Sequence, residues 1–470
     1  AAMGAVMGCG PGKQRARPDV LLITIDTLRA DYVHAYGFPL EITPSIDALA
    51  ARGVLFENAI AAATLTAPAH ASIMTSQYVR QHSIGSRNGD TRLDGLSTLA
   101  ETFAEAGYAT AAFISNAVLR RRIGLDRGFE TYDDELPSLE QNRGNYFERI
   151  AEETAGRALE WLALRPDADP VFLWLHLQDP HGPYTPPADW VGRVGEFPLS
   201  IRRPLATLRA NSGRAGIPLY QALGEEVDPA FYAGRYAEEI QYADHWVGQV
   251  IAALERHGAE RGSVILLTAD HGESLGESGW FFQHGQSTAP ELARVPFVLA
   301  APGLDPARIQ GLVSHVDIAP TLIALAGLPA LPGARGLALE EEIRDGEVAG
   351  GRLIFCDTDG ESAVYGPGSW TRVAGSIASD RVGDVMQVTR VESIRLTEAG
   401  KWRPSDLDLS AQRGLEEYLE GRAPLVVAGP MEPQHIEELR ALGYLPPVEG
   451  DREAPDARAD ESPVSENLSP

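Results

Sequence analysis

Two continuous apolar runs mark the pattern of hydrophobic and polar positions, and each ends on an acidic residue. Val264–Ala269 is followed by Asp270, and Val20–Ile25 is followed by Asp26. Uninterrupted apolar runs of this length are typical of strands buried on both faces of a parallel sheet. The two strands therefore predict one sheet that carries acidic side chains to one edge, where an open α/β sheet binds its ligand.

Helical patterns alternate with these strands. Thr43–Gly53 predicts a helix that starts after Thr43 and is closed by glycine, and residues 63–75 predict a hydroxyl-rich turn entering a second helix. Residues 146–164 and 231–257 show the apolar spacing of amphipathic helices. The alternation predicts an α/β fold with a mostly parallel central sheet sandwiched by helices.

Composition shifts along the chain predict its division into parts. We expect a leader over residues 1–18, one large domain over 19–330, and a linker with a small C-terminal α+β subdomain over 331–445. Residues 446–470 are rich in Pro, Asp, Glu and Ser and predict a disordered acidic tail. Residues 195–228 mix Pro, Gly and Arg and are interpreted as an insertion that shapes substrate choice.

Composition and charge narrow the class of partner. The 470 residues are 44% hydrophobic and 23% charged, as in a soluble globular protein. The net charge of −26 argues against nucleic acid or an anionic membrane surface as the main partner. An anionic substrate would therefore need a locally positive site, such as a metal ion with Arg and His around it.

The first residues favour export. Val6–Gly10 contains Cys9 and resembles the end of a bacterial lipoprotein signal, in which Cys9 would carry a lipid anchor. This reading places the protein in the periplasm or on the outer face of a bacterial membrane; the alternative is a disordered Gly/Ala leader. No other apolar run approaches the ~18 residues of a membrane span, and the second cysteine, Cys356, gives no disulfide framework.

Three residue types at the predicted strand ends suit a metal ion. Carboxylate oxygens and neutral imidazole nitrogens are ordinary ligands for divalent cations, and Asp26, Asp270 and His271 supply them. The alternative is a strand-ending turn with a surface Asp–His pair. Thr66 begins a predicted helix whose free N–H groups suit an anion, although Thr is also a common N-cap.

The order of several motifs resembles that of the sulfatase family of the alkaline phosphatase superfamily. The resemblance covers roughly residues 19–330, with one short match near residue 440. The matching segments are Ile25–Asp31, Thr66–Thr75, Leu99–Phe113, Phe172–Tyr184, Thr268–Glu273, His284–Gly285, Arg294–Phe297, Val316–Leu322 and Glu438–Leu445.

The resemblance implies a role for each candidate site residue. It implies one divalent metal ion (Ca, Mn or Mg, with Zn as a further candidate) held by Asp26, Asp270 and His271. It implies that Thr66 is the nucleophile and that His181 binds the substrate or donates a proton. The remaining assignments are His284 facing the anionic group, Arg29 and His70 in substrate binding, and His176 as a core histidine; Arg29 alternatively bridges Asp31.

Two positions depart from the family pattern. Members that act through formylglycine carry Cys or Ser in a Cys/Ser-x-Pro-x-Arg motif, whereas this chain has Thr66–His70, so we expect no conversion. The family's paired aspartates appear as Asp26–Thr27. A threonine ester cannot eliminate sulfate as formylglycine does, and it has to be opened by attack at the central atom, which favours phosphoester chemistry.

These observations predict a metal-dependent hydrolase of sulfate or phosphate esters with a threonine nucleophile. Its substrate would be a small anionic ester on a sugar, lipid or aryl group. The alternatives are a phosphoglycerol-type transferase and a catalytically silent metal-binding homologue. The sequence leaves open the choice between sulfate and phosphate, the leaving group and the oligomeric state.

Overall fold

The structure is a computed structural model that describes residues 17–415. It leaves out residues 86–91, 145, 167–168, 195–202, 349–351, 359, 367–368, 378–385, 397–401 and 405–414. Cys9 and the predicted acidic tail therefore lie outside the described residues. The predicted domain boundaries stay predictions.

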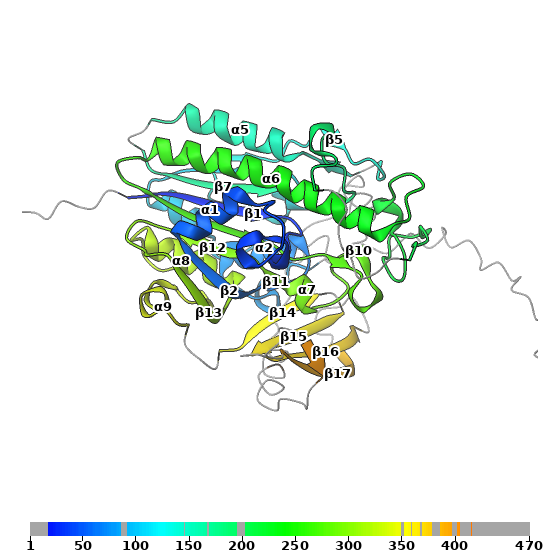
Figure 1. The fold of residues 1–470 in the computed structure, drawn as a ribbon. Helices are drawn as coiled ribbons and strands as arrows, with labels where there is room; N and C mark the ends of the chain where they lie inside the picture. Colours follow the sequence, from blue (N-terminus) through cyan, green and yellow to red (C-terminus); the bar gives the residue numbers. More distant parts are fainter. Residues whose placement is uncertain are drawn as a thin grey trace, which may run out of the picture.

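A mostly parallel nine-stranded sheet forms the centre of the molecule (Figure 1). Its strand order is β11-β2-β12-β8-β1-β7-β3-β4, with β13 paired to β2. The strands are β1 (Asp19–Ile25), β2 (Val54–Ile60), β3 (Ala109–Phe113), β4 (Thr131–Asp133), β7 (Val171–Leu177), β8 (Ser263–Ala269), β11 (Arg294–Val295), β12 (Phe297–Ala300) and β13 (Ala307–Ser314). Only β11 and β12 run antiparallel to their neighbours in this sheet. The predicted α/β fold class is confirmed.

The two strands predicted from their apolar runs lie side by side in the middle of this sheet. β1 and β8 pair in parallel from Asp19 opposite Ser263 to Ile25 opposite Ala269. Their apolar side chains are buried because helices cover both faces of the sheet. Asp26 and Asp270 follow these strands directly, so they emerge next to each other at the carboxyl edge.

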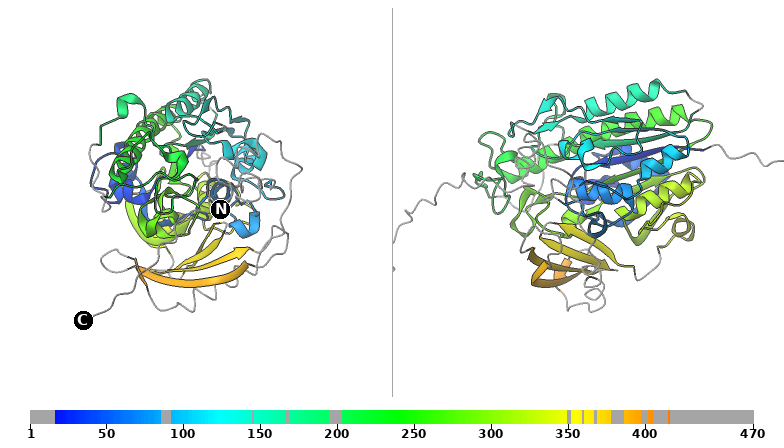
Figure 2. Two further views of the ribbon diagram at one scale, coloured as in Figure 1. Left: turned by 90° about the vertical axis from the view of Figure 1, so that its right-hand side faces the viewer. Right: turned by 180° about the vertical axis from the view of Figure 1, so that it is seen from behind.

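Helices cover both faces of the sheet (Figures 1 and 2). One face carries α1 (Pro44–Arg52), α5 (Ala151–Ala163) and α6 (Pro229–His257), and the other carries α2 (Thr66–Thr75), α4 (Leu99–Glu105) and α8 (Ile318–Leu325). The shorter helices are α3 (Val79–His82), α7 (Pro290–Ala293) and α9 (Glu340–Asp345). Short 3-10 turns occupy Ala30–Tyr32, His34–Tyr36, Ala117–Leu119, Arg121–Ile123, Ala188–Trp190, Leu219–Gln221, Glu277–Gly279 and His315–Asp317. No helix in the described ranges is long and apolar enough to cross a membrane.

The helix predicted over residues 146–164 starts later than expected. Residues 147–148 instead form the short strand β6 (Phe147–Glu148), paired with β5 (Ser138–Leu139). Arg149 explains the delay, because its buried guanidinium donates to Asp133 Oδ1 at 2.8 Å and to the Ile114 carbonyl oxygen at 2.6 Å. These long-range bonds hold the segment extended, and α5 begins only at Ala151.

A five-stranded antiparallel sheet lies below the central sheet in Figures 1 and 2. It consists of β14 (Ile354–Thr358), β15 (Glu361–Gly366), β16 (Ser369–Ile377), β17 (Met386–Leu396) and β18 (Trp402–Pro404). Its presence confirms a smaller C-terminal subdomain built on a sheet. A further two-stranded ribbon, β9 (Ser274–Leu275) and β10 (Phe281–Gln283), follows the predicted acidic strand end.

Candidate active site

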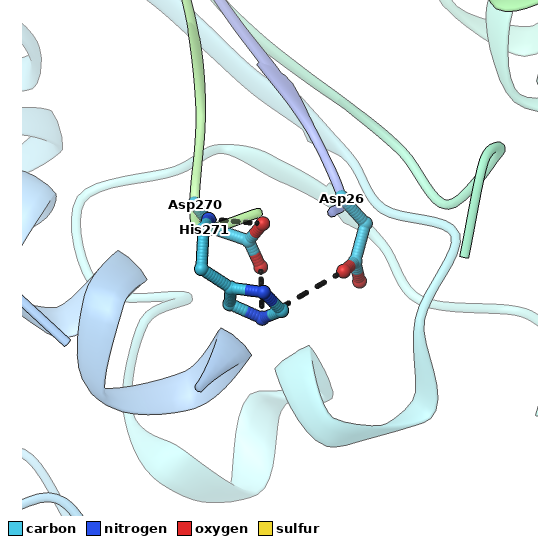
Figure 3. A group of neighbouring side chains, drawn as sticks. All are labelled: Asp26, Asp270 and His271. Atoms are coloured by element: carbon cyan, nitrogen blue, oxygen red, sulfur yellow. Dashed lines mark hydrogen bonds and ion pairs between the residues drawn. The ribbon is translucent and has the colours of Figure 1, made fainter. Parts of the chain in front are cut away.

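Asp26, Asp270 and His271 meet at the carboxyl ends of β1 and β8 (Figure 3). One potential ligand atom from each lies within 4.8 Å of the other two, and all three side chains are fully buried. The backbone N–H groups of Thr27 and His271 donate to Asp270 Oδ1 at 3.1 and 2.8 Å. These bonds hold the Asp270 carboxylate in place and leave its Oδ2 directed to the cluster.

The three side chains fit a divalent cation. Asp26 Oδ1 and Asp270 Oδ2 are buried without a hydrogen-bond partner among the described residues, and burying such charges is costly unless a cation compensates them. His271 Nδ1 lies 3.0 Å from the Gly272 carbonyl oxygen, so Nδ1 carries the proton and the Nε2 lone pair is free to bind. His271 Nε2 lies 3.9 Å from Asp26 Oδ1 and 3.4 Å from Asp270 Oδ2.

The pKa of His271 suits a metal ligand, whereas the two carboxyl groups oppose each other's ionisation. Burial lowers the pKa of His271 to about 4, so its imidazole is neutral near pH 7, as a metal ligand must be. Burial raises the pKa of Asp26 well above its ordinary value, and the neighbouring Asp270 raises it further. Two carboxylates this close repel each other until a cation lies between them.

Thr66 opens α2 beside this cluster. Its hydroxyl oxygen lies 3.3 Å from His271 Nε2, and the residue is fully buried. The N-cap of α2 is Leu65, whose side chain makes no capping hydrogen bond. Thr66 is the first residue of the helix and does not occupy the N-cap position.

A series of hydrogen bonds holds the backbone of Thr66 in place. Trp174 Nε1 donates to Thr24 Oγ1 at 3.0 Å, Thr24 Oγ1 lies 3.0 Å from His70 Nε2, and His70 Nδ1 lies 2.8 Å from the Thr66 carbonyl oxygen. Burial lowers the pKa of His70, so the ring is neutral: Nδ1–H donates to the carbonyl and Nε2 accepts from Thr24. Both ring nitrogens of His70 thus have protein partners, through which His70 positions Thr66, and its predicted contact with the substrate stays a prediction.

Arg29 is bound to protein groups. Its Nε and Nη2 donate to the Asp31 carboxylate at 2.9 and 2.8 Å, and Nη1 donates to the Glu273 carbonyl oxygen and to Glu277 Oε1. Of the two alternatives drawn from the sequence, the structure shows the bridge to Asp31. Each guanidinium nitrogen of Arg29 has a protein partner, and its contact with the substrate stays a prediction.

His181 and His284 form a row with His271. The ring centres of His271 and His284 are 4.5 Å apart, and those of His284 and His181 are 5.1 Å apart. Glu273 joins the row, with Oε1 3.5 Å from His284 Nδ1, and its Oε2 accepts from the Tyr184 hydroxyl at 3.2 Å. Burial, with contributions from His284 and Arg143, lowers the pKa of His181 well below its ordinary value. A neutral His181 favours substrate binding over proton donation.

Two residues beside Asp26 were not predicted as part of the site. Asn116 Nδ2 donates to Asp26 Oδ2 at 2.8 Å, and His176 Nε2 lies 3.8 Å from the same oxygen. His176 is buried in the core, as predicted, but its Nε2 faces a candidate ligand. The sequence could have indicated both residues, because His176 and Asn116 lie near the carboxyl ends of β7 and β3. These two strands come next to β1 in the order of the sheet.

The α/β fold thus gathers acidic, imidazole and hydroxyl groups at one edge of its central sheet. The model of the sulfatase family matches residues 18–328, and the chain belongs to that family. The chain is an ester hydrolase of this family.

Individual relatives support the assignment. The chain is 27% identical to Uncharacterized sulfatase YidJ of Escherichia coli over 359 residues, which cover 69% of this chain and 71% of the relative. It is 25% identical to a Delta 4,5-hexuronate-2-O-sulfatase of Bacteroides thetaiotaomicron, covering 72% and 74%. The crystal structure of a phosphonate monoester hydrolase of Agrobacterium radiobacter shares the fold, with a TM-score of 0.65, 21% identity and coverage of 86% and 95%.

Proposed function

We propose that the protein hydrolyses sulfate or phosphate esters with Thr66 as nucleophile and one divalent cation held by Asp26, Asp270 and His271. One observation carries this proposal. The Thr66 hydroxyl lies 3.3 Å from His271 Nε2, at the first residue of a ten-residue helix. A hydroxyl at a helix N-terminus is placed where an anionic group binds, because the first N–H groups of the helix have no intrahelical partner.

Each residue of the candidate site has its own role in the proposed reaction. The Thr66 oxygen forms a bond to sulfur or phosphorus as its proton leaves, and the bond to the leaving-group oxygen breaks as that oxygen takes up a proton. Water then attacks the central atom, which releases Thr66 and an inorganic anion. His70 holds the Thr66 carbonyl during both steps, and the His181–His284 row binds the leaving-group side. A divalent cation in the site would supply positive charge that favours the ionised hydroxyl.

The side chain of Thr66 favours phosphate over sulfate esters. Threonine has a single hydroxyl, so its ester has no second oxygen through which to expel the bound group. Water or another acceptor has to attack the central atom of the ester instead. The hexuronate sulfatase among the relatives is a reason to keep sulfated sugars among the substrates tested.

A substrate panel with metal analysis tests the proposal. Purified protein would be assayed on an aryl sulfate, a sulfated sugar, a phosphate monoester, a phosphodiester and a phosphonate monoester, with bound metal measured on the same sample. Turnover that requires the metal supports the proposal. A transferase would instead release little product to water until a sugar or glycerol acceptor is added. No turnover with full metal content would identify a silent homologue.

A further inference from the structure

A buried arginine lies beside the His181–His284 row and has no role in the chemistry above. Arg143 follows β5 and is only 7% exposed. Its guanidinium carbon lies 4.3 Å from the ring centre of Tyr146 and 4.5 Å from that of Tyr220, so an aromatic ring packs on either side. Cation–aromatic contacts of this kind hold a guanidinium plane in one orientation.

Glu140 occupies one edge of that guanidinium. Arg143 Nε donates to the two carboxylate oxygens of Glu140 at 2.8 and 2.7 Å, and Nη2 donates to Glu140 Oε2. Among the described residues, Arg143 Nη1 makes no hydrogen bond, so the guanidinium keeps donors for a further oxygen. The Glu140 carboxylate therefore fixes the arginine without using all of its N–H groups.

The positions of Tyr146 and Tyr220 show that the Arg143 guanidinium lies next to the candidate site. The ring centres of Tyr146 and Tyr220 each lie 6.4 Å from that of His181. The Tyr220 hydroxyl donates to the Phe282 carbonyl oxygen at 2.9 Å, two residues before His284. The two rings therefore place the Arg143 guanidinium beside His181.

Two chain segments combine to build this element. Asn142 Nδ2 donates to the carbonyl oxygens of Tyr220 and Ala222 at 2.8 and 2.7 Å, which ties the loop before β6 to the segment that was interpreted as an insertion. The described part of that insertion, residues 203–228, therefore reaches the site. Tyr220 belongs to this segment and packs on Arg143, which supports the interpretation of the segment as a determinant of substrate choice.

We propose that Arg143, held by Glu140 and packed between Tyr146 and Tyr220, binds an anionic oxygen of the substrate. The inference rests on the proposed function and adds to it a specificity-determining residue. A chain with a net charge of −26 needs a local cation to receive an anion, and Arg29 is already occupied by Asp31 and Glu277. The anionic oxygen belongs either to the ester group itself or to a carboxylate on the leaving group.

Binding measurements in a Thr66→Ala background test this without turnover. Titration calorimetry on metal-loaded protein would use 4-nitrophenyl phosphate and sulfate, and the same esters with a carboxylate on the ring. Arg143→Met should weaken binding by about tenfold or more, the usual loss for a charge-assisted hydrogen bond. Arg143→Lys should recover part of it, because lysine keeps the charge without the planar fork.

Two variants control for folding and for nonspecific charge. Arg143→Met leaves the Glu140 carboxylate buried without its partner, so Glu140→Gln/Arg143→Met is measured alongside it. Arg193→Met removes an exposed arginine, whose guanidinium carbon lies 4.0 Å from the Trp190 ring centre, and should leave binding unchanged.

The outcomes separate the two sources of the anion. Equal losses on all esters assign Arg143 to the ester oxygens, and a loss confined to the carboxylated esters assigns it to the leaving group. Unchanged binding of every ester to both Arg143→Met proteins overturns the inference. Failure of the proposed function is a different result, namely turnover by Thr66→Ala or no turnover by the unmutated protein.

Discussion

The Thr66 hydroxyl is the group on which the proposed reaction depends. It is buried, lies within reach of His271, and is held through its backbone by His70. It combines the first position of a helix with proximity to the acidic cluster. Its substitution is therefore the most direct probe of the chemistry.

Thr66→Ala should abolish turnover of every ester, whether the leaving group is good or poor, because no other oxygen can form the covalent ester. Steady-state kinetics across the panel, with metal content measured in parallel, would show this. Thr75→Ala is the matched control, since Thr75 closes the same helix and its hydroxyl donates to the Ala71 carbonyl oxygen. Activity of Thr66→Ala near that of the control would exclude a threonine nucleophile.

Thr66 should also be chemically unmodified. Formylglycine arises from Cys or Ser, and neither occupies this position. Mass spectrometry of the peptide that contains Thr66, from protein made in its native host, should give the unmodified mass. An aldehyde at that residue would contradict the proposed mechanism.

His181→Ala should reduce kcat/KM for nitrophenyl and alkyl esters by similar factors, on the order of tenfold, the usual scale of one lost hydrogen bond. The reason is that burial lowers the pKa of His181 well below its ordinary value, so the ring is neutral and binds without donating a proton. Paired kinetics on the two ester types measure this. A loss of ~10²–10⁴-fold confined to alkyl esters would instead identify His181 as the general acid.

At the scale of elements, the C-terminal sheet holds two segments of the site. Asp357 in β14 exchanges backbone hydrogen bonds with Ala62 and Thr64, just before Thr66. Glu361 in β15 accepts from the Thr288 backbone N–H at 2.7 Å and the Ser287 hydroxyl at 3.1 Å, just after His284. The small sheet therefore positions residues of the larger domain.

Glu361→Ala should lower kcat/KM by about 10–100-fold without changing metal affinity. Small displacements of a group that contacts substrate are costly, and the candidate metal ligands lie on β1 and β8, outside the segment that Glu361 holds. Kinetics combined with metal titration separates these effects. Glu255→Ala, which removes a partly exposed ion pair with Arg52, is the control. Equal activity of the two variants would show that the 284–289 segment is held by other contacts.

At the scale of the whole molecule, the acidic cluster couples metal binding to stability. Asp26 and Asp270 bury unpaired oxygens at the carboxyl edge of the central sheet, where their repulsion opposes folding in the absence of a cation. A ligand that binds only the folded chain stabilises it by about 2.7 kcal/mol at a concentration of 100 times its Kd.

A divalent cation should therefore raise the melting temperature by a few degrees, and a chelator should reverse the shift. Calorimetric scans with Ca, Mn, Mg and Zn would rank the ions. Asp270→Asn should remove the shift, whereas Asp305→Asn, an exposed position, should preserve it. A shift that persists in Asp270→Asn would place the cation elsewhere.

The sequence by itself determined the strands that matter most and the acids that end them. Such apolar runs are typical of strands in a covered parallel sheet, and parallel strands bring their carboxyl ends to one edge, so Asp26 and Asp270 were predictable neighbours. The position of Thr66 at a helix start followed from local pattern as well. These features depend on short segments and on the period of the backbone.

Only the tertiary structure decided which side chains act on those groups. Asn116 reaches Asp26 from β3, and Tyr220 reaches Arg143 from a segment that carries no readable motif. Arg29 and Arg143 are both arginines near acidic residues in the sequence, yet Arg29 is bound on every nitrogen and Arg143 is packed beside His181. Such partners come from distant parts of the chain. Their contacts depend on side-chain packing, which the local pattern of hydrophobic and polar residues does not reveal.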